Sequence, residues 1–303
     1  MIILGSGPAG LTAAIYSARA AFKTLLIAGQ QYGGQLMSTT LVENYPGFPE
    51  GIMGPQLMTQ MLEQAKTQGT EVVYRNADKV ELDAKIKKVW ADGTEYNAKM
   101  VIIAVGSTPR KLGVPGEEKL WGKGVSSCAT CDGAFYKDKI VAVIGGGDSA
   151  AEEATFLTRF AKKVYIIHRR DELRASKAMQ ERVFSNEKIE VIWDTEVQAV
   201  LGDLKVSGLK IKNNKDNTEK NLDIDGMFLA IGHLPNSEFL GDAVERDEKG
   251  FIVAKEHTYT NIEGVFVCGD VNDHRYQQAV TAAGMGCMAA LDAEKWYQMN
   301  IEG

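Results

Sequence analysis

Two cysteines separated by two residues are the first candidates for chemistry in this sequence. Cys128 and Cys131 form a C-x-x-C motif, and Asp132 follows it directly. Such a pair can close into a small disulfide ring whose thiols exchange with other disulfides. A zinc site would need two more ligands at short spacing, and the four histidines are scattered. The motif therefore predicts redox chemistry without a metal, with Asp132 as a candidate general acid. Cys268 and Cys287 stand alone, and we interpret them as buried packing residues.

Two glycine-rich motifs could bind phosphates. Residues 5–10 read GSGPAG and residues 145–150 read GGGDSA, about 140 residues apart. Each follows a short apolar run and precedes a stretch that favours a helix, which is the context of a dinucleotide-binding fingerprint. Glycines allow the backbone to approach a pyrophosphate, and the helix N-terminus supplies N–H donors. One such motif alone would also fit a tight turn, but the pair predicts two nucleotide sites.

The residues after the second motif indicate NADPH. The predicted strand 163–167 ends in His168, Arg169 and Arg170, and Arg174 follows. An NAD site usually has an acidic residue here, whereas guanidinium groups suit the 2′-phosphate of NADPH. His168 either stacks on the adenine or simply ends the strand. We expect NADPH to contact Gly145, Gly147, Asp148, Ser149, Ala150, His168, Arg169, Arg170 and Arg174.

The first motif is followed by residues that fit FAD better than a second nicotinamide. Its second strand, 24–28, is followed by neither an acid nor a base. Loops 33–35 and 44–47 are rich in glycine and amides, and Asp270 at a strand end could hold a ribityl hydroxyl. A helix start near residues 278–279 would favour negative charge on a reduced isoalloxazine. We expect FAD to contact Gly5, Gly7, Pro8, Ala9, Gly10, Gly29, Gly34, Gln35, Leu36, Asn44, Gly106, Gly269, Asp270, Gln278 and Ala279.

The elements that must position these groups form a repeated pattern. Apolar runs at 1–4, 24–28, 101–105, 139–144, 163–167 and 264–268 predict strands, and 11–21, 151–160 and 276–298 predict helices. Residues 101–109 resemble residues 227–235, each a strand closed by Gly and then Pro. The first run is short, so either the chain begins at the edge of the sheet or residues that usually precede it are missing.

This pattern predicts an α/β protein with two Rossmann-like domains of the three-layer ββα type, the second inserted into the first. We expect an FAD-binding domain from residues 1–112 and 242–303. An NADPH-binding domain that carries the C-x-x-C motif would comprise residues 113–241. The chain would cross between the domains near residues 112–115 and 238–241.

Length and composition limit the class of protein. At 303 residues, two domains are expected. A net charge of −6 argues against a general nucleic-acid binder. No apolar run approaches the ~20 residues of a membrane span, and no signal peptide is evident. We therefore expect a cytoplasmic protein without a nucleic-acid or membrane partner.

Across essentially its whole length, the sequence resembles the bacterial-type, low-molecular-weight NADPH-dependent thioredoxin reductases. The matching segments are residues 5–10, 33–36, 43–47, 128–133, 145–150, 168–170 and 269–271. The resemblance implies a cytoplasmic homodimer that passes electrons from NADPH to FAD, to the Cys128–Cys131 disulfide and then to thioredoxin. It also implies that Cys131 lies nearer the flavin, that Cys128 attacks thioredoxin and that Asp132 handles protons.

Two residues depart from the family pattern where the protein substrate would dock. Ala134 precedes Phe135 where the family often has two aromatic residues, and Lys123 stands where an arginine is often found. Other interpretations are a flavin reductase that uses ferredoxin or quinones, a ferredoxin-fed thioredoxin reductase, a flavin dithiol oxidase and a nucleotide-binding redox sensor. The C-x-x-C pair argues against the first, and the basic segment would be idle in the next two.

The order of the motifs predicts motion. Cys128 and Gly145 lie between the same two crossings, whereas Gly5 and Asp270 lie outside them. A disulfide and a nicotinamide carried by one domain must both reach a flavin held by the other. We therefore expect the inserted domain to rotate about the crossings between steps.

Overall fold

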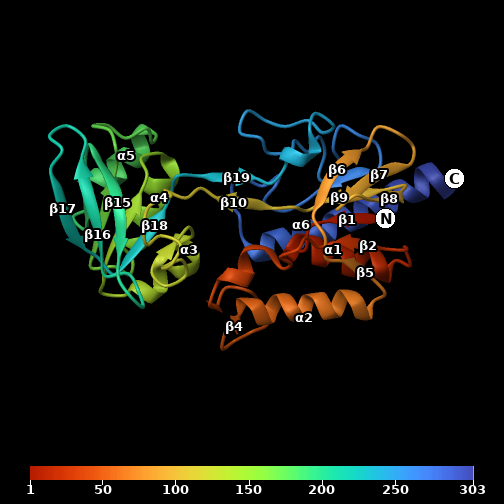
Figure 1. The fold of residues 1–303 in the computed structure, drawn as a ribbon, viewed down its shortest axis with the longest axis horizontal. Coiled ribbons are helices and arrows are strands. Elements are labelled where there is room, and N and C mark those ends of the chain that lie inside the picture. The colour runs from red at the N-terminus through yellow and green to blue at the C-terminus, as the bar shows by residue number, and fades with distance from the viewer. Residues whose placement is uncertain (303) are drawn as a thin grey trace. The chain divides into compact units, whose positions relative to one another are not determined.

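The computed structural model describes residues 1–302 and contains two compact units. Unit 1 comprises Met1–Thr108 and Leu234–Gly303, and unit 2 comprises Pro109–His233. The second unit is therefore inserted into the first, as the repeated motifs predict. Each unit is an α/β domain with its own parallel sheet, which confirms the predicted fold class (Figure 1).

Unit 1 contains a five-stranded parallel sheet in the order β20-β9-β1-β2-β5. Its strands are β1 (Ile2–Leu4), β2 (Leu25–Ile27), β5 (Glu71–Val73), β9 (Val101–Ile103) and β20 (Val265–Val267). Strand β1 occupies the centre of the sheet, so the first of the two alternatives for the short run, a start at the sheet edge, is wrong. Its three residues are apolar and buried because the strand is covered on both faces.

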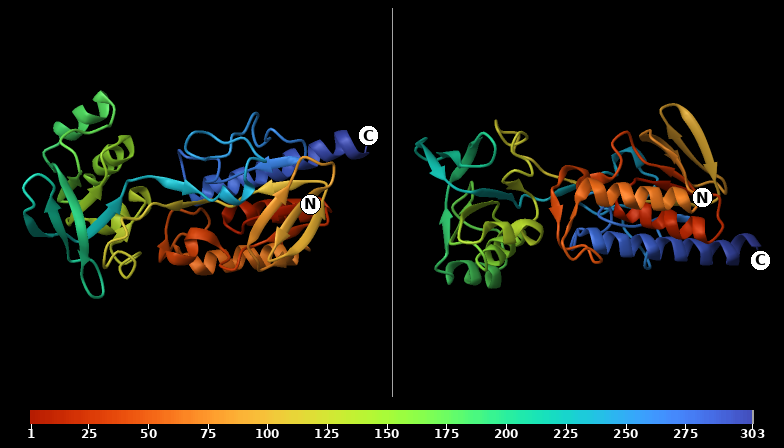
Figure 2. Two further views of the ribbon diagram at one scale, coloured as in Figure 1. Left: turned by 45° about the horizontal axis from the view of Figure 1, so that its top comes forward. Right: turned by 90° about the horizontal axis from the view of Figure 1, so that it is seen from below.

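Two layers cover the sheet of unit 1. One face packs against α1 (Pro8–Arg19), α2 (Gly54–Thr67) and α6 (Ala279–Tyr297), which lie side by side in Figure 2. The other face packs against an antiparallel sheet of β6 (Ala77–Glu81), β7 (Lys87–Ala91) and β8 (Thr94–Ala98). Alternation along β1 explains the division, since Ile3 faces the helices while Ile2 and Leu4 face the small sheet.

Unit 2 repeats this three-layer design. Its parallel sheet has the order β11-β18-β12-β13-β14. These strands are β11 (Val125–Ser126), β12 (Ile140–Ile144), β13 (Lys163–Ile167), β14 (Ile189–Ile192) and β18 (Gly226–Leu229). One face packs against α3 (Ala129–Asp132), η2 (Gly133–Tyr136), α4 (Asp148–Leu157) and α5 (Lys177–Phe184). The other packs against the antiparallel β15 (Thr195–Leu201), β16 (Gly208–Asn213) and β17 (Glu219–Asp223).

The two crossings between the units pair with each other. Strands β10 (Ser107–Pro109) and β19 (His233–Pro235) form a two-stranded ribbon. The units therefore divide at residues 108/109 and 233/234, several residues before the predicted crossings near 112–115 and 238–241. The similar segments 101–109 and 227–235 each end in one of these crossing strands. The two strands are more than 120 residues apart in the sequence, so their pairing could not be predicted from the repeat alone.

The remaining elements are short. They are β3 (Leu41–Val42), β4 (Ile52–Met53), η1 (Gly34–Ser38), η3 (Glu238–Leu240) and η4 (Gln298–Glu302). Helix α6 begins at Ala279, which confirms the helix start expected near residues 278–279 and lies three residues inside the helical stretch predicted from residue 276. Gln278 and Thr281 form a reciprocal capping box at this N-terminus. No helix within residues 1–302 is long and apolar enough to span a membrane.

Candidate active site

Cys128 and Cys131 form a disulfide at the end of strand β11. Their Cα atoms are 5.3 Å apart, a separation that suits a disulfide. The Cys128 carbonyl accepts hydrogen bonds from the N–H groups of Cys131 (3.3 Å) and Asp132 (3.2 Å), which closes the single turn of α3. The backbone N–H of Cys128 donates to the Ser126 hydroxyl at 3.0 Å. The turn therefore fixes the disulfide at the edge of the unit 2 sheet.

Asp132 is the carboxyl group beside the disulfide. Burial raises its pKa, and a hydrogen bond with Ser126 partly opposes that rise. A carboxyl that keeps its proton to higher pH is a better proton donor near neutrality. Burial, together with the negative charges of Asp132 and Asp225, also raises the pKa of Tyr136 to about 12.

The segment after the disulfide presents one aromatic residue to solvent. Phe135 is 41 % exposed, whereas Tyr136 is buried and packs edge-on against Phe228 at 5.2 Å. Ala134 is exposed, as is Lys123 before the motif. The two departures from the family pattern therefore lie on the surface of unit 2.

The phosphate-binding loop of unit 2 is closely packed under its first glycine. Gly145 has φ of +153°, and a Cβ there would lie 2.5 Å from the Ala230 carbonyl oxygen. Gly147 is the N-cap of α4, and space around it is open. Asp148 and Ser149 are exposed in the first turn, while Ala150 is buried beneath the loop. The loop backbone is thus accessible where a pyrophosphate would bind.

Asp148 is already engaged within unit 2. Its carboxylate accepts a hydrogen bond from the backbone N–H of Ser176 at 2.8 Å, and this interaction lowers its pKa. The structure therefore gives Asp148 a role in tying the start of α4 to the segment before α5.

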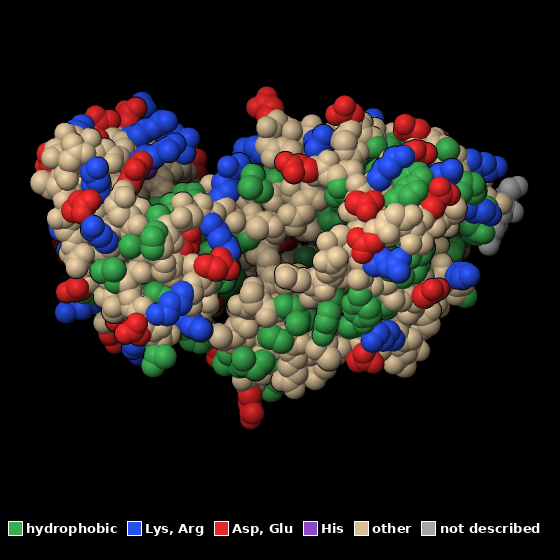
Figure 3. Space-filling model, in the orientation of Figure 1, with side chains coloured by type: hydrophobic (Ala, Val, Ile, Leu, Met, Phe, Trp, Pro, Cys, Tyr) green, Lys and Arg blue, Asp and Glu red, His purple; other side chains and the backbone are tan. Residues whose placement is uncertain are grey.

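The basic segment follows β13 and is exposed. Arg169, Arg170 and Arg174 are all exposed, and within residues 1–302 none of their guanidinium groups forms a salt bridge. Figure 3 shows Lys and Arg side chains gathered over the part of unit 2 around α5. Nearby, Lys215 forms ion pairs with Asp171 (3.3 Å) and Asp194 (2.9 Å). The three arginines are thus available to bind an anion.

His168 is only 5 % exposed, unlike the arginines that follow it. Its imidazole packs edge-on against Trp193, with ring centroids 6.5 Å apart, and lies directly against Gly146. Its Nε2 is buried and has no hydrogen-bond partner among the described residues. Burial lowers the pKa of His168, a hydrogen bond with the Glu172 backbone partly opposes this shift, and the nearby guanidinium groups lower the pKa further. The ring therefore belongs to the interior of the loop rather than to an open face.

In unit 1, the backbone packs so closely around two glycines of the phosphate-binding loop that no side chain fits there. Gly5 has φ of +97°, and a Cβ there would lie 2.4 Å from the Ala104 carbonyl oxygen. A Cβ on Gly10 would lie 1.9 Å from the Gly5 carbonyl oxygen. Pro8 and Ala9 begin α1 directly after the Gly7 N-cap, where the missing Pro N–H costs nothing. The loop can therefore approach a phosphate closely only with glycine at these positions.

Two residues missing from the sequence-based prediction connect the loops of unit 1. The buried Ser6 hydroxyl donates to the Ala28 carbonyl at 2.6 Å and accepts from the Gly33 N–H at 3.0 Å. The Asn76 carboxamide oxygen accepts from the Gln30 N–H at 3.0 Å. Ser6 occupies a variable position of the motif, and Asn76 follows a strand far along the chain. No local signal could have identified either residue.

The loop of residues 33–36 extends this surface. A Cβ on Gly34 would lie 3.4 Å from the Gly7 Cα, so these glycines are neighbours. The Gln35 amide donates to the Ser107 carbonyl at 2.9 Å. The Ser107 hydroxyl itself is buried without a partner in the described part of the chain. Predicted FAD residues on distant segments therefore meet in one region: the 5–10 loop, Gly29, Gly34, Gln35, Leu36 and Gly106.

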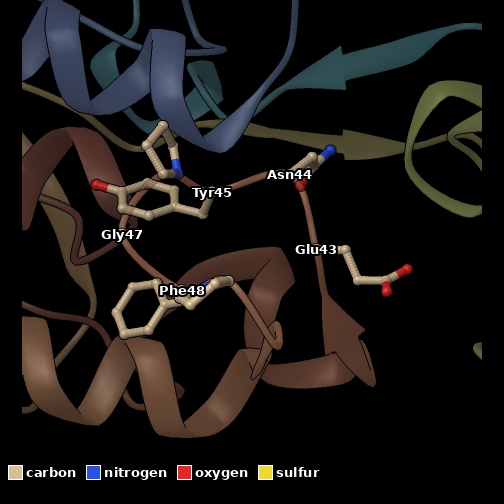
Figure 4. A pocket seen from close by; sticks show the side chains of 7 residues that line it. Glu43, Asn44, Tyr45, Gly47 and Phe48 are labelled. Carbon is tan, nitrogen blue, oxygen red and sulfur yellow. The ribbon is translucent and has the colours of Figure 1, made fainter.

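The loop of residues 43–49 lines a cavity of about 470 Å³. Figure 4 shows the Tyr45 and Phe48 side chains on one side of this loop and Glu43 directed away from them. The Asn44 amide donates to the Gln278 side-chain oxygen at 3.4 Å. Asn44 and Gln278, which are separated by 234 residues and both predicted to contact FAD, therefore meet beside the start of α6.

Asp270 lies at the end of β20. Burial, with a smaller contribution from Asp273, raises the pKa of Asp270 to about 7. A Cβ on the preceding Gly269 would lie 2.8 Å from the Ala9 Cβ, so this strand end passes close to α1. Cys268 is fully buried, and burial raises the pKa of its thiol to about 12. The thiol is therefore inert, as expected for a packing residue. Cys287 is only half-buried, so the expectation that it is also a buried packing residue is wrong.

Unit 2 contains a second perturbed carboxyl that sequence analysis missed. Burial, followed by the charge of Glu152, raises the pKa of Glu153 to about 8. Its Oε2 has no hydrogen-bond partner within the described residues. Glu153 follows another glutamate in a helical stretch, which ordinarily indicates an exposed face, so its burial was not predictable.

Comparison with known proteins identifies the relatives of this chain. The family model for pyridine nucleotide-disulphide oxidoreductases matches residues 1–286. A thioredoxin reductase of Mycolicibacterium smegmatis is 54 % identical over 297 residues, which cover 98 % of this chain and 96 % of that protein.

Solved structures give the same result. A crystal structure of thioredoxin reductase from Streptococcus pyogenes superposes with a TM-score of 0.94 at 42 % identity, covering 98 % of this chain and 97 % of that one. Lactococcus lactis thioredoxin reductase, described as the FR conformation, superposes with a TM-score of 0.65 at 44 % identity, covering 97 % of both chains.

Proposed function

This chain belongs to the pyridine nucleotide-disulphide oxidoreductase family, among the thioredoxin reductases, and we propose that it transfers electrons from NADPH through FAD and the Cys128–Cys131 disulfide to the disulfide of a thioredoxin. The observation that carries this proposal is in unit 2. The Cys128–Cys131 disulfide and the unpaired arginines of the basic segment lie in the same inserted unit. A flavin reductase needs no such disulfide, and a ferredoxin-fed enzyme needs no 2′-phosphate site.

The residues of unit 1 fit FAD. Gly5 and Gly10 form a cradle that any Cβ would fill, and the helix α1 starts directly behind it. Asp270 is a half-buried carboxyl with a raised pKa, as expected for a group that awaits hydrogen-bond donors such as ribityl hydroxyls. The Asn44–Gln278 contact would border the flavin at the start of α6.

The residues of unit 2 fit NADPH. Gly145 and Gly147 open the backbone for a pyrophosphate at the start of α4. Arg169, Arg170 and Arg174 provide unpaired guanidinium groups for a 2′-phosphate. When bound, FAD and NADPH supply the hydride and two-electron chemistry, while the protein provides orientation and electrostatics.

The cysteines and Asp132 carry out the exchange with the protein substrate. In the reduced dithiol, the Cys128 thiolate attacks one sulfur of the thioredoxin disulfide, which forms a mixed disulfide and releases the other sulfur as a thiolate. Cys131 then attacks the Cys128 sulfur, which restores the Cys128–Cys131 bond and releases reduced thioredoxin. Asp132, with its raised pKa, holds the proton that a departing thiolate needs.

Exposure in the structure does not assign these two roles, since Cys131 is exposed and Cys128 is half-buried. A trapping experiment separates them. With Cys131→Ser, Cys128 should form a stable mixed disulfide with thioredoxin on non-reducing gels, whereas Cys128→Ser should trap much less. The reverse pattern would exchange the roles of the two cysteines.

The proposed cycle includes rotation of unit 2 relative to unit 1. The disulfide and the nucleotide site lie between the crossings β10 and β19, while the predicted flavin site lies outside them. Two solved thioredoxin reductases of nearly equal identity to this chain give TM-scores of 0.94 and 0.65, which supports more than one arrangement of the domains in these proteins. A cross-link that locks the units should stop turnover but preserve one of the two half-reactions. Normal turnover by a fully locked protein would exclude the rotation.

Unit 1 also supports assembly into a homodimer. Helix α6 exposes Val280 (43 %), Met288 (43 %) and Leu291 (51 %) on one face, and Tyr16 of the neighbouring α1 is 43 % exposed. An apolar face of this kind suits contact with a second copy of the chain. Sedimentation should give a dimer, and Leu291→Lys should shift it to a monomer. A wild-type monomer at micromolar concentration would exclude this assembly. Family membership further suggests a cytoplasmic location.

The decisive experiment measures NADPH oxidation by the purified flavoprotein with thioredoxin, and compares ferredoxin, oxygen and a small disulfide as acceptors. We expect steady turnover with thioredoxin and NADPH, and much slower turnover with NADH. Turnover with ferredoxin as electron donor but not with NADPH would favour the ferredoxin-fed enzyme. Binding of nucleotides without turnover of any disulfide would favour a redox sensor.

A further inference from the structure

The two phosphate-binding loops use the same pair of positions in opposite ways. In unit 1, the residue after the first glycine is Ser6, and the residue after the second strand is the small Ala28; the Ser6 hydroxyl donates to the Ala28 carbonyl at 2.6 Å. In unit 2, the corresponding residues are Gly146 and His168. There the loop residue has no side chain and the strand-end residue is large.

The His168 ring occupies the space that a side chain on Gly146 would need. A Cβ on Gly146 would lie 2.2 Å from the His168 Cε1, 2.4 Å from Nδ1 and 2.6 Å from Nε2. Three ring atoms therefore face the Gly146 backbone. Such distances cannot occur between real atoms, so any larger residue at position 146 would require the His168 ring to move.

The same loop residue also holds the basic segment. The Gly146 carbonyl accepts hydrogen bonds from the N–H groups of Arg174 (2.6 Å) and Ala175 (3.2 Å). Gly146 thus contacts the basic segment at both ends, through the His168 ring at its start and through two backbone hydrogen bonds near its end. A displacement of the loop would move the arginines, and the reverse also holds.

We propose that His168 is a positioning residue for NADPH selectivity, which seats the glycine loop against the basic segment and thereby fixes the spacing between the pyrophosphate site and the 2′-phosphate site. This inference rests on the proposed use of NADPH. The two phosphate groups are joined covalently in one nucleotide. The protein therefore gains the full affinity of both only if loop and arginines are held at the matching distance before binding. His168 itself touches neither phosphate.

Calorimetric titration with three nucleotides tests this role. NADP⁺ carries both phosphate groups, NAD⁺ carries the pyrophosphate alone, and adenosine 2′-monophosphate carries the 2′-phosphate alone. With His168→Ala, we expect the affinity for NADP⁺ to fall about tenfold, which corresponds to 1.4 kcal/mol. The affinity for adenosine 2′-monophosphate should change less than about twofold, because the arginines remain present.

Two further variants serve as matched controls. The double variant Arg169→Gln with Arg170→Gln should lower the affinity for both NADP⁺ and adenosine 2′-monophosphate, as expected when ligands are lost. Combining Gly146→Ser with His168→Ala reproduces in unit 2 the pair that unit 1 uses. This variant should recover most of the NADP⁺ affinity that His168→Ala loses, and it keeps the test valid if the single variant is poorly folded.

Two results would overturn the proposal. Equal losses for NADP⁺ and adenosine 2′-monophosphate in His168→Ala would make His168 a direct ligand, as in adenine stacking. Unchanged NADP⁺ affinity would show that the ring does not position the loop. Failure of the underlying function would be visible separately, because the wild-type protein would then bind NADP⁺ no more tightly than NAD⁺.

Discussion

The parallel sheets of the two units have the same strand order, but the strand at one edge comes from a different part of the chain in each unit. In unit 1, β20 pairs beside β9 and comes from the C-terminal segment. In unit 2, the equivalent strand β11 pairs with β18. It comes from the segment just before β12, the strand that leads into the glycine motif of this unit. The carboxyl end of this edge strand carries Asp270 in unit 1 and the Cys128–Cys131 disulfide in unit 2. One position in a repeated fold thus carries a carboxyl group in one unit and a disulfide in the other.

The second strands of the two motifs differ in charge. Strand β2 ends in neutral residues whose backbone is held by Asn76, whereas β13 leads into three unpaired arginines. Both units therefore share the same kind of glycine loop, and we expect the residues after the second strand to decide which nucleotide each unit binds.

The largest expected effect comes from removing the chemistry that only unit 2 carries. Cys128→Ser and Cys131→Ser should each abolish thioredoxin reduction, because a single thiol cannot complete the exchange. Both variants should retain FAD and accept electrons from NADPH, as monitored by flavin absorbance in stopped flow. Cys268→Ala and Cys287→Ala serve as controls and should keep substantial activity. If Cys268→Ala were as inactive as Cys128→Ser, a single redox pair would not explain the activity.

The next effect uses the last residue of each glycine motif, which is Gly10 in unit 1 and Ala150 in unit 2. Gly10→Ala should destabilise unit 1 by about 3 kcal/mol or more and prevent FAD retention, since its Cβ would lie 1.9 Å from a backbone oxygen. Flavin content and thermal unfolding report both effects. The matched change in unit 2 is Ala150→Gly, which should cost only ~1 kcal/mol because a methyl group already fits there. Similar losses in the two variants would contradict the asymmetry between the loops.

A smaller effect concerns the charged strand end of unit 2. Replacing Arg169 and Arg170 with glutamine should raise the KM for NADPH at least about tenfold, because each charge-assisted contact contributes ~1.5–3 kcal/mol. The KM for NADH should hardly change. Steady-state kinetics with both nucleotides measure the difference. Equal losses for both nucleotides would show that the arginines support the fold rather than the 2′-phosphate.

The smallest effect is a pH dependence of stability that both units share. Burial raises the pKa of Asp270 to about 7 and that of Glu153 to about 8. Because the folded state binds these protons more tightly than the unfolded state, the stabilisation is present at pH ~4 and is lost as pH rises through these values. We expect each carboxyl to contribute on the order of 1–3 kcal/mol to this decline.

Urea unfolding of the flavin-free protein between pH 5 and 9 measures the decline. Asp270→Asn should make the decline shallower up to pH ~7.5, and Glu153→Gln should make it shallower up to pH ~8.5, because the two contributions overlap at lower pH. FAD should suppress the Asp270 component alone if unit 1 binds the flavin. A flat stability profile in the wild-type protein would show that neither carboxyl is buried in solution as it is in the structure.

Much of this protein could be predicted from short sequence segments. The glycine motifs, the C-x-x-C pair, the arginines after residue 168 and the repeat of residues 101–109 each lie within about ten consecutive residues. Local backbone demands, such as positive φ at Gly5, and local charge are properties that neighbouring residues express directly. They were sufficient for the two-domain α/β fold and the insertion, whereas the order of electron carriers came from the family resemblance.

The tertiary structure decided what depends on contacts between distant residues. The central place of β1, the pairing of the crossing strands, the Ser6 bridge between loops and the seat of the His168 ring on Gly146 each join segments more than 20 residues apart. Burial of Glu153 likewise depends on what packs over its helix. Hydrophobic patterning within a segment records that a face is covered, but the identity of the covering residues is set only when the chain has folded.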